Sequence, residues 1–318
     1  MFNLIILLTE HFVIPAVFTV WLWKRLYKSK FDAIFMALLV GVYIHYIYRG
    51  GEWHLFGYYF RYFWGAAFLV ALLRMVYQLR SLPFWSPKTR KEKFGLYFMG
   101  FFSAVFLGLG IWACRGTTFR GEAVSLSFPL KNGNFYVIEG GDSPVINNHH
   151  RFFPVPEKFS LEVVKLDNAG RYARGFFPEE LTAYFAFGEK VYSPCTGIVV
   201  SVIDSLPDLP PSELAGKEDV FPGNQVIIDH GGVWVYLSRL KLHSISVQPG
   251  DTVHTGQLLG EIGNSGLLGG PFGLTAAPHL HIQATRKSGP ENSYYEREGV
   301  AMLFGGKFLA KNTLIETL

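Results

Sequence analysis

The hydrophobic positions of this chain are concentrated in its first third. Four apolar stretches lie there, at about residues 3–23, 32–49, 57–79 and 94–114. Each has close to the ~20 residues that a helix needs to cross the hydrocarbon core of a membrane. The pattern therefore predicts a region of four transmembrane helices over residues 1–114.

After residue 114 the pattern changes to short runs in which apolar and polar residues alternate. Examples are Gln225–Asp229, Val233–Leu237 and His279–Gln283. Alternation of this kind is typical of strands with one buried face, and the frequent Gly and Pro residues between the runs indicate tight turns. We therefore expect an all-β domain with an antiparallel sheet over residues 135–318, joined to the helices by a connector at residues 115–134.

Positive charge is concentrated in two of the three loops between the apolar stretches. The basic residues of these two loops are Lys24, Arg25, Lys28 and Lys30, and Arg80, Lys88, Arg90, Lys91 and Lys93. The loop between the second and third stretches instead carries Arg49 against Glu52. Because cytoplasmic loops are enriched in Lys and Arg, the two basic loops are predicted to be cytoplasmic. Both termini and the β domain then lie on the extracytoplasmic side.

The composition excludes several classes of protein. Of the 318 residues 49% are hydrophobic and only 17% are charged, which excludes a disordered chain and is unusual for a soluble domain. The formal net charge of +4 gives no support for a nucleic-acid partner. The two cysteines, Cys114 and Cys195, are too few for a disulfide scaffold or a thiolate metal site.

A His-x-His pair at residues 279–281 is the most specific candidate for a metal-binding or catalytic site. On a strand His279 and His281 would project to one face, while Leu280 and Ile282 would project into the core. Two imidazoles on one wall suit a zinc site in which one ligates the metal and the other acts on the substrate. An isolated pair would more simply be two surface histidines, so the surrounding residues decide between the two interpretations.

An ordered series of short segments precedes this pair. The segments are Val191–Pro194, Gly197–Val199, Gly223–Ile228, Ser244–Val247, Gly250-Asp251 and Gly263–Gly266. In their order and spacing, about residues 135–310 resemble the lysostaphin-type (LytM-like) zinc metallopeptidases. The resemblance implies a compact antiparallel β fold with a groove, Zn²⁺ as cofactor, and peptide cross-links of bacterial peptidoglycan as substrate. With the predicted helices, it implies a multi-pass protein of the bacterial cytoplasmic (inner) membrane with an extracytoplasmic C-terminal domain.

Carried over residue by residue, the resemblance implies that His281 is a zinc ligand and His279 a catalytic histidine. The two remaining ligands align with His149 and Glu162, following a subset of the family in which these ligands are far apart in sequence. His150 is the alternative to His149, and on a strand only one of these neighbours can face the site. Glu162 is one methylene longer than the usual Asp, but zinc binds either carboxylate at about the same distance.

A further catalytic histidine of the family aligns with Arg239. A guanidinium cannot accept a proton at physiological pH, but it can donate hydrogen bonds to a developing oxyanion. The departures at Glu162 and Arg239 leave two functions open. The first is a membrane-anchored zinc metalloendopeptidase that acts on peptidoglycan peptides, which we favour. The second is a catalytically inactive domain that binds wall peptides or regulates another wall hydrolase.

Overall fold

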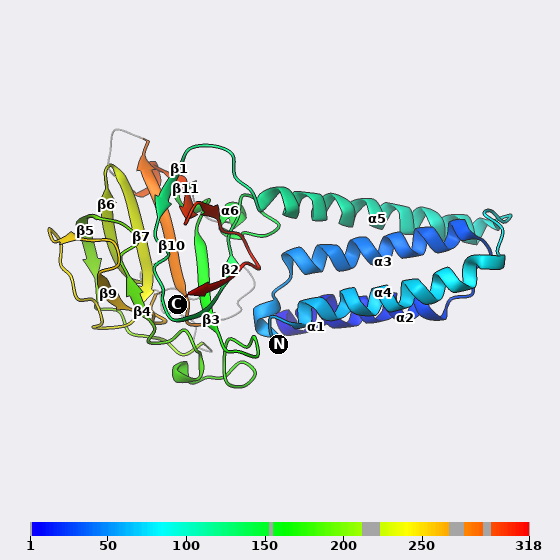
Figure 1. The fold of residues 1–318 in the computed structure, drawn as a ribbon, viewed down its shortest axis with the longest axis horizontal. Helices are drawn as coiled ribbons and strands as arrows, with labels where there is room; N and C mark the ends of the chain where they lie inside the picture. Colours follow the sequence, from blue (N-terminus) through cyan, green and yellow to red (C-terminus); the bar gives the residue numbers. More distant parts are fainter. Residues whose placement is uncertain (1, 153–154, 212–222, 267–276, 289–293, 318) are drawn as a thin grey trace. The chain divides into compact units, whose positions relative to one another are not determined.

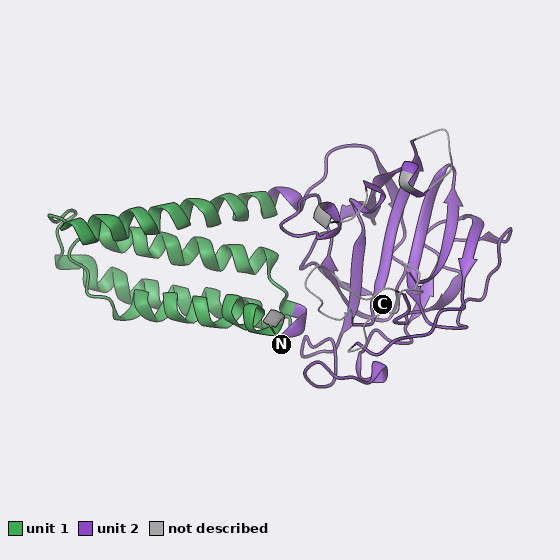
Figure 2. Cartoon of the chain, turned by 180° about the vertical axis from the view of Figure 1, so that it is seen from behind, with its two compact units in different colours: residues 1–53, 58–114 green, residues 54–57, 115–318 purple. Residues whose placement is uncertain are grey.

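The computed structural model describes residues 2–152, 155–211, 223–266, 277–288 and 294–317. Helices dominate the first part of the chain and strands the second (Figure 1). The chain divides into two compact units, Met1–Trp53 with Tyr58–Cys114, and His54–Gly57 with Arg115–Leu318 (Figure 2). The predicted fold class, four apolar helices followed by a mostly antiparallel β domain, is confirmed.

The helical unit contains four long apolar segments. They are α1 (Phe2–Leu8), which continues through the π-helical turn η1 (Thr9–Val13) into α2 (Ile14–Lys24), and α3 (Lys30–Gly50), α4 (Phe60–Gln78) and α5 (Arg90–Gly116). The short helices η2 (Trp53–Leu55) and η3 (Leu79–Ser81) flank α4. By length and composition each of the four segments can cross a membrane.

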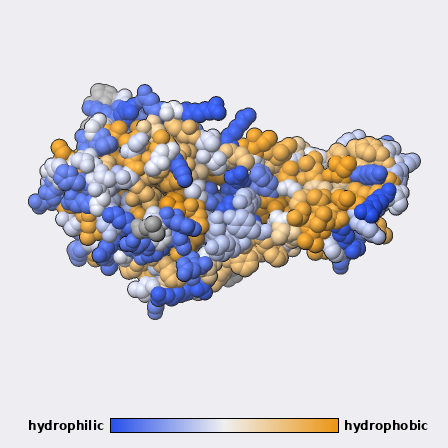
Figure 3. Space-filling model, viewed as in Figure 1, coloured by the Kyte–Doolittle hydropathy of each residue, from blue (hydrophilic) through white to orange (hydrophobic). Residues whose placement is uncertain are grey.

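Apolar side chains also lie on the outside of this unit. Exposed examples are Val13, Val17, Leu69, Leu73, Phe98 and Phe101. Figure 3 shows hydrophobic residues over most of the visible face of the helices, with hydrophilic ones near the α2–α3 and α4–α5 loops. A large apolar outer surface suits contact with lipid rather than with water, so the helices suggest membrane anchoring.

A buried polar cluster marks the beginning of α3. The Ser29 hydroxyl accepts a hydrogen bond from the Asp32 backbone N–H at 3.4 Å, which caps the helix. Lys88, in the segment before α5, places its Nζ 2.7 Å from Asp32 Oδ2, and the two side chains are 2% and 9% exposed. This buried ion pair joins the start of α3 to the segment that leads into α5.

The β unit is built around one large sheet in which strands follow the order β13-β2-β3-β10-β7-β6-β5-β8. Their bounds are β2 (Gly133–Glu139), β3 (Leu161–Leu166), β5 (Gly197–Ile203), β6 (Asn224–His230), β7 (Val233–Leu240), β8 (Thr252–Val253), β10 (Leu280–Lys287) and β13 (Leu314–Thr317). Off this path lie β1 (Ala123–Leu126), β11 (Arg297–Phe304) and β12 (Lys307–Phe308), and a separate pair is formed by β4 (Lys190–Tyr192) and β9 (Leu258–Glu261). Among the described residues of this unit, four short helices accompany the strands: α6 (His149–Phe152), η4 (Val155–Glu157), η5 (Leu181–Ala183) and η6 (Tyr294–Glu296).

Strand pairing is antiparallel throughout the described residues except between β1 and β11. The β6–β7 hairpin is enforced by the two-residue turn Gly231-Gly232, whose φ angles of 64° and 90° suit glycine and match the twist of the strands. β1 and β11 are far apart in sequence, so no tight turn forces an antiparallel arrangement on them. β1 lies within the segment predicted as a connector.

β10 occupies a central place in the sheet, paired with β3, β7 and β11. Leu280, Ile282 and Ala284 on one face belong to the hydrophobic core. His281 and Gln283 lie on the opposite face and are also buried, at 2% exposed each. Because both faces of the strand are covered, these polar side chains must find partners within the protein.

Candidate metal centre

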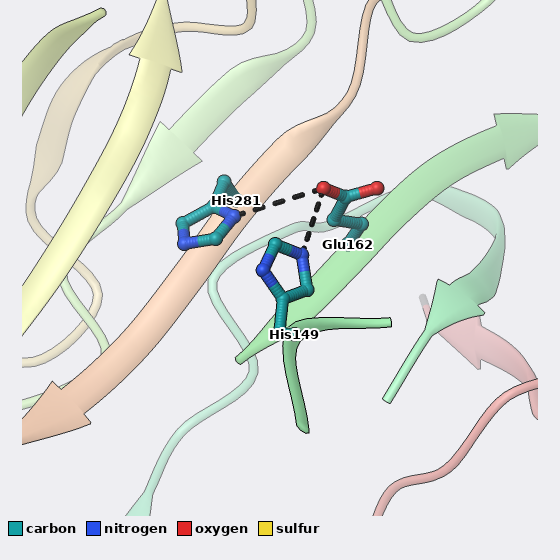
Figure 4. Close-up of side chains that lie close together, drawn as sticks. All are labelled: His149, Glu162 and His281. Atoms are coloured by element: carbon teal, nitrogen blue, oxygen red, sulfur yellow. Dashed lines mark hydrogen bonds and ion pairs between the residues drawn. The ribbon is translucent and has the colours of Figure 1, made fainter. Parts of the chain in front are cut away.

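Three side chains from separate segments meet beside β10: His149 from α6, Glu162 from β3 and His281 from β10 (Figure 4). Their ligand atoms all lie within 4.8 Å of one another. Glu162 Oε1 is 3.0 Å from His149 Nε2 and 3.9 Å from His281 Nδ1. The structure thus brings the three predicted ligands together, and their role in binding metal stays a prediction.

The register of the sheet places Glu162 beside His281. The two residues are directly opposite each other in the antiparallel β3–β10 pair, so their side chains lie on the same face. A slip of one residue would send His281 into the core and bring Leu280 or Ile282 to the site. Because apolar and polar side chains alternate along β10 and the apolar ones must lie in the core, the position of His281 relative to Glu162 is fixed.

His149 lies on a short helix rather than on a strand, so the expected strand geometry is wrong at this position. Its backbone N–H donates to Asn147 Oδ1 at 3.0 Å, and Asn147 Nδ2 in turn donates to the Ser160 carbonyl. Successive residues on a helix point about 100° apart. His150 accordingly contacts a different group, Asp142, with 3.2 Å between its Nε2 and Asp142 Oδ1.

The cluster is largely shielded from solvent. His149, His279 and His281 are 3%, 1% and 2% exposed, and the Glu162 side chain is 16% exposed. An ionised carboxylate in such surroundings is costly unless a positive charge or several donors accompany it. The site therefore favours a cation next to Glu162.

The pKa values of His149 and Glu162 also show that positive charge is favoured next to the Glu162 carboxylate. Burial opposes protonation of His149, but its hydrogen bonds to Glu157 and Glu162 outweigh burial and raise its pKa to about 10. Burial likewise opposes ionisation of Glu162, yet its electrostatic interaction with the neighbouring His279 and its hydrogen bond with His149 hold its pKa well below the usual value. A proton on His149 thus occupies the electrostatic role that a metal ion could take.

The outer nitrogens of the two aligned histidines are both hydrogen-bonded. His149 Nδ1 lies 3.0 Å from Glu157 Oε2, and His281 Nε2 lies 3.4 Å from Gln283 Oε1. Because carboxylate and amide oxygens only accept, these outer nitrogens carry hydrogens, and a neutral ring then has its lone pair on the inner nitrogen. His149 Nε2, His281 Nδ1 and Glu162 Oε1 form a set of three inward-facing acceptors. This donor set fits zinc, which binds imidazole nitrogen and carboxylate oxygen and whose histidine ligands commonly have such outer partners.

His279 lies beside the cluster, immediately before β10. Its Nε2 is 3.5 Å from Glu162 Oε1, and its Nδ1 is 2.6 Å from the Ala277 carbonyl oxygen. Since a carbonyl oxygen can only accept, Nδ1 carries the hydrogen and Nε2 presents a lone pair. Nε2 is buried and makes no hydrogen bond within the described part of the chain.

Arg239 is the extra residue of a bulge in β7, where the pairing with β6 shifts. Its φ of 68° is uncommon for a residue other than glycine, and such strained bulges often re-aim side chains near functional sites. The side chain is 6% exposed, and within the described ranges its Nε and Nη1 have no hydrogen-bond acceptor. Burial lowers the pKa of Arg239, and the charges of Glu162 and Glu157 oppose that shift.

The sequence interpretation missed Glu157 and Gln283. Gln283 follows His281 by two residues on β10, so strand alternation alone could have placed it on the face of the site. Glu157 lies on η4, five residues before Glu162, and no strand period links the two positions. Its place beside His149 is a tertiary arrangement that no local sequence pattern reveals.

Residues 182–293 match Peptidase family M23. The chain therefore contains an M23 (LytM/lysostaphin-type) domain over these residues, and the family resemblance is confirmed there. Arg239, His279 and His281 lie within the match, whereas His149 and Glu162 precede it. No curated protein matches the sequence.

Several solved structures are similar to this chain at low identity. A Ruminococcus gnavus protein provisionally named glycyl-glycine endopeptidase lytM is 17% identical over 89% of this chain and 82% of that one, with a TM-score of 0.34. A zinc-containing peptidase from Vibrio cholerae is 21% identical over 51% and 37% of the two chains, with a TM-score of 0.29. The catalytic domain of lysostaphin from Staphylococcus simulans is 20% identical over 42% and 78%, with a TM-score of 0.24.

Proposed function

We propose that this chain is a membrane-anchored, zinc-dependent hydrolase of peptidoglycan peptides. The observation that supports this most is the convergence of the inner atoms of His149, Glu162 and His281 within 4.8 Å. It occurs in a chain that carries an M23 domain, and members of that family are typically zinc metallopeptidases that hydrolyse peptidoglycan. Zinc held by these residues would polarise the scissile carbonyl and lower the pKa of a water molecule.

His279 is proposed to move the proton. Its Nδ1–H is held by the Ala277 carbonyl, which leaves Nε2 as the acceptor for a proton from the attacking water. The Glu162 carboxylate, 3.5 Å from Nε2, would stabilise the imidazolium that results. The same nitrogen could then return the proton to the amine that leaves.

Arg239 is proposed to stabilise negative charge on the substrate oxygen. A guanidinium stays protonated at physiological pH, so it cannot replace the histidine that the family has at this position as a base. It can donate N–H groups to an oxygen on which charge develops. The proposed division of roles is therefore proton transfer by His279 and charge stabilisation by Arg239.

Metal analysis of the full chain in detergent tests the zinc site. After loading and gel filtration the wild type should retain about one zinc ion per chain. His281→Ala should lose it, because two protein ligands hold zinc poorly. His150→Ala removes the neighbour of an aligned ligand and should keep the metal. A wild-type chain that retains no zinc would contradict the proposal.

A second candidate function is a domain that binds wall peptides without cleaving them, or that regulates another hydrolase. Arg239 favours it, because the resemblance implies a histidine at this position and a guanidinium cannot accept a proton at physiological pH. Incubation with purified peptidoglycan separates the two candidates. New amino termini that disappear with a chelator support the hydrolase, whereas binding without release in the presence of zinc supports the second function.

We further infer from the basic loops that the β unit lies on the outer side of the cytoplasmic membrane, where peptidoglycan is found. Fusions of the chain's C-terminal end to two reporters test this placement. Alkaline phosphatase, which folds only outside the cytoplasm, should be active, and a reporter that works only in the cytoplasm should be silent. The reverse pattern would overturn the inferred orientation.

A further inference from the structure

A continuous series of hydrogen bonds joins the outer nitrogens of His149 and His281. Glu157 Oε2 lies 3.0 Å from His149 Nδ1, and Glu157 Oε1 accepts from the Tyr294 hydroxyl at 2.8 Å. The Tyr294 oxygen accepts from Gln283 Nε2 at 3.1 Å, and Gln283 Oε1 lies 3.4 Å from His281 Nε2. Three side chains therefore link the two histidines on the side away from Glu162.

The three linking side chains come from three different elements, η4, η6 and β10. Glu157 and Gln283 are 0% and 2% exposed. The Ser160 hydroxyl donates a further hydrogen bond to Gln283 Oε1 at 3.0 Å. Because water cannot freely reorient such buried groups, the direction of each hydrogen bond is set by its neighbours.

Glu157 gives the series its direction. An ionised carboxylate can only accept, so both His149 Nδ1 and the Tyr294 hydroxyl must donate to it. The Tyr294 oxygen then accepts from the amide nitrogen of Gln283, which turns the amide oxygen toward His281. His281 Nε2 must donate to that oxygen, and the lone pair of His281 is left on Nδ1, toward Glu162.

We propose that Glu157 sets the orientation and tautomer of both histidine ligands, although the ring to which it hydrogen-bonds is that of His149. Tyr294 and Gln283 are positioning residues that carry its effect to His281. The inference rests on the proposed zinc site, because its consequence is that the ligand nitrogens of both rings face the metal before it binds.

Replacing Glu157 by Gln shows why the carboxylate is needed at this position. The new amide could still accept from His149 Nδ1, but its nitrogen would then donate to the Tyr294 oxygen. That oxygen would then face two donors, and the Tyr294 hydroxyl could no longer donate to residue 157. Reversal of the Gln283 amide would relieve this conflict, but it would move the His281 proton to Nδ1, where a zinc ion must bind.

The test uses the full chain in detergent, labelled with ¹⁵N-histidine and loaded with zinc. The imidazole N–H resonances of His149 and His281 report the two outer hydrogen bonds, and competition with a chelator reports zinc affinity. Glu157→Gln should lower zinc affinity about 10- to 100-fold, as loss of an outer partner of a metal ligand commonly does. It should also shift the N–H resonance of His281, whose outer nitrogen is hydrogen-bonded to Gln283 rather than to Glu157.

Tyr294→Phe interrupts the series without altering the contact between Glu157 and His149. It should shift the N–H resonance of His281, leave that of His149 in place, and lower zinc affinity less than Glu157→Gln. The matched control is Asp142→Asn, which weakens the similar carboxylate pair with His150 outside the aligned ligands. This control should change neither resonance and should bind zinc as the wild type does.

Unchanged zinc affinity and an unchanged His281 resonance in Glu157→Gln would overturn the inference while leaving the proposed zinc site intact. Failure of the wild type to bind zinc would instead contradict the proposed function and this inference together. Thermal unfolding of each metal-free variant separates loss of fold from loss of positioning. If Glu157→Gln does not fold, the His281 resonance in Tyr294→Phe decides, since a resonance that stays in place contradicts the inference.

Discussion

At the scale of single residues, the centre depends on the reach of Glu162. Its carboxylate extends from β3 to within 3.0 Å of His149 Nε2, and His149 is held on α6 by Asn147. The family resemblance implies the shorter Asp at this position. The separation between β3 and α6 is therefore matched to a side chain with one additional methylene.

This match predicts that Glu162→Asp weakens zinc binding, even though the family resemblance implies Asp at this position. Withdrawal of the carboxylate from His149 should lower zinc affinity by about tenfold or more, an effect similar to losing an outer ligand partner. Chelator competition measures the change. Glu189→Asp, which shortens a carboxylate paired with Lys165 elsewhere in the unit, is the control and should leave affinity unchanged. Tighter binding by Glu162→Asp would contradict the account.

At the scale of elements, buried ion pairs hold loops to helices. Lys88→Met should destabilise the helical unit by about 3–5 kcal/mol, because it leaves Asp32 buried without its partner. Thermal unfolding in detergent measures the change, and the double variant Lys88→Met with Asp32→Leu should recover much of the stability. Lys28→Met, which removes an exposed pair with Glu92, should cost far less stability, because solvent screens that pair. Equal effects of the two single variants would refute the argument.

Elements with a clear period could be predicted from the sequence, and irregular ones could not. The alternation at residues 225–229, 233–237 and 279–283 anticipated β6, β7 and β10. The four residues of α6 are too few for a helical period, so His149 was expected on a strand. The parallel pairing of β1 depends on a strand far along the chain, which no local pattern reveals.

The same distinction applies to the site. His281 and His279 belong to a compact motif, and Glu162 could be aligned because the segments around it resemble those of a subset of the family. The outer partners Glu157 and Tyr294 lie on single-turn helices, η4 and η6, and meet only when the sheet has formed. Their contribution is a property of tertiary packing rather than of any short segment.

At the scale of the whole molecule, the chain combines an apolar helical unit with a β unit that has its own hydrophobic core. The exposed apolar side chains of the helices predict an integral membrane protein. Expressed in bacteria, the chain should stay in the membrane pellet after an alkaline carbonate wash and enter solution only with detergent. Release by the wash alone would show that the helices do not cross the bilayer.

The proposed function requires a metal ion bound by residues of α6, β3 and β10. X-ray absorption at the zinc edge of the loaded full chain tests this most directly. We predict a first shell of nitrogen and oxygen at about 2.0–2.2 Å, with the scattering pattern of two imidazoles that is lost in His281→Ala. A shell that contains sulfur at about 2.3 Å, or one that His281→Ala leaves unchanged, would contradict it.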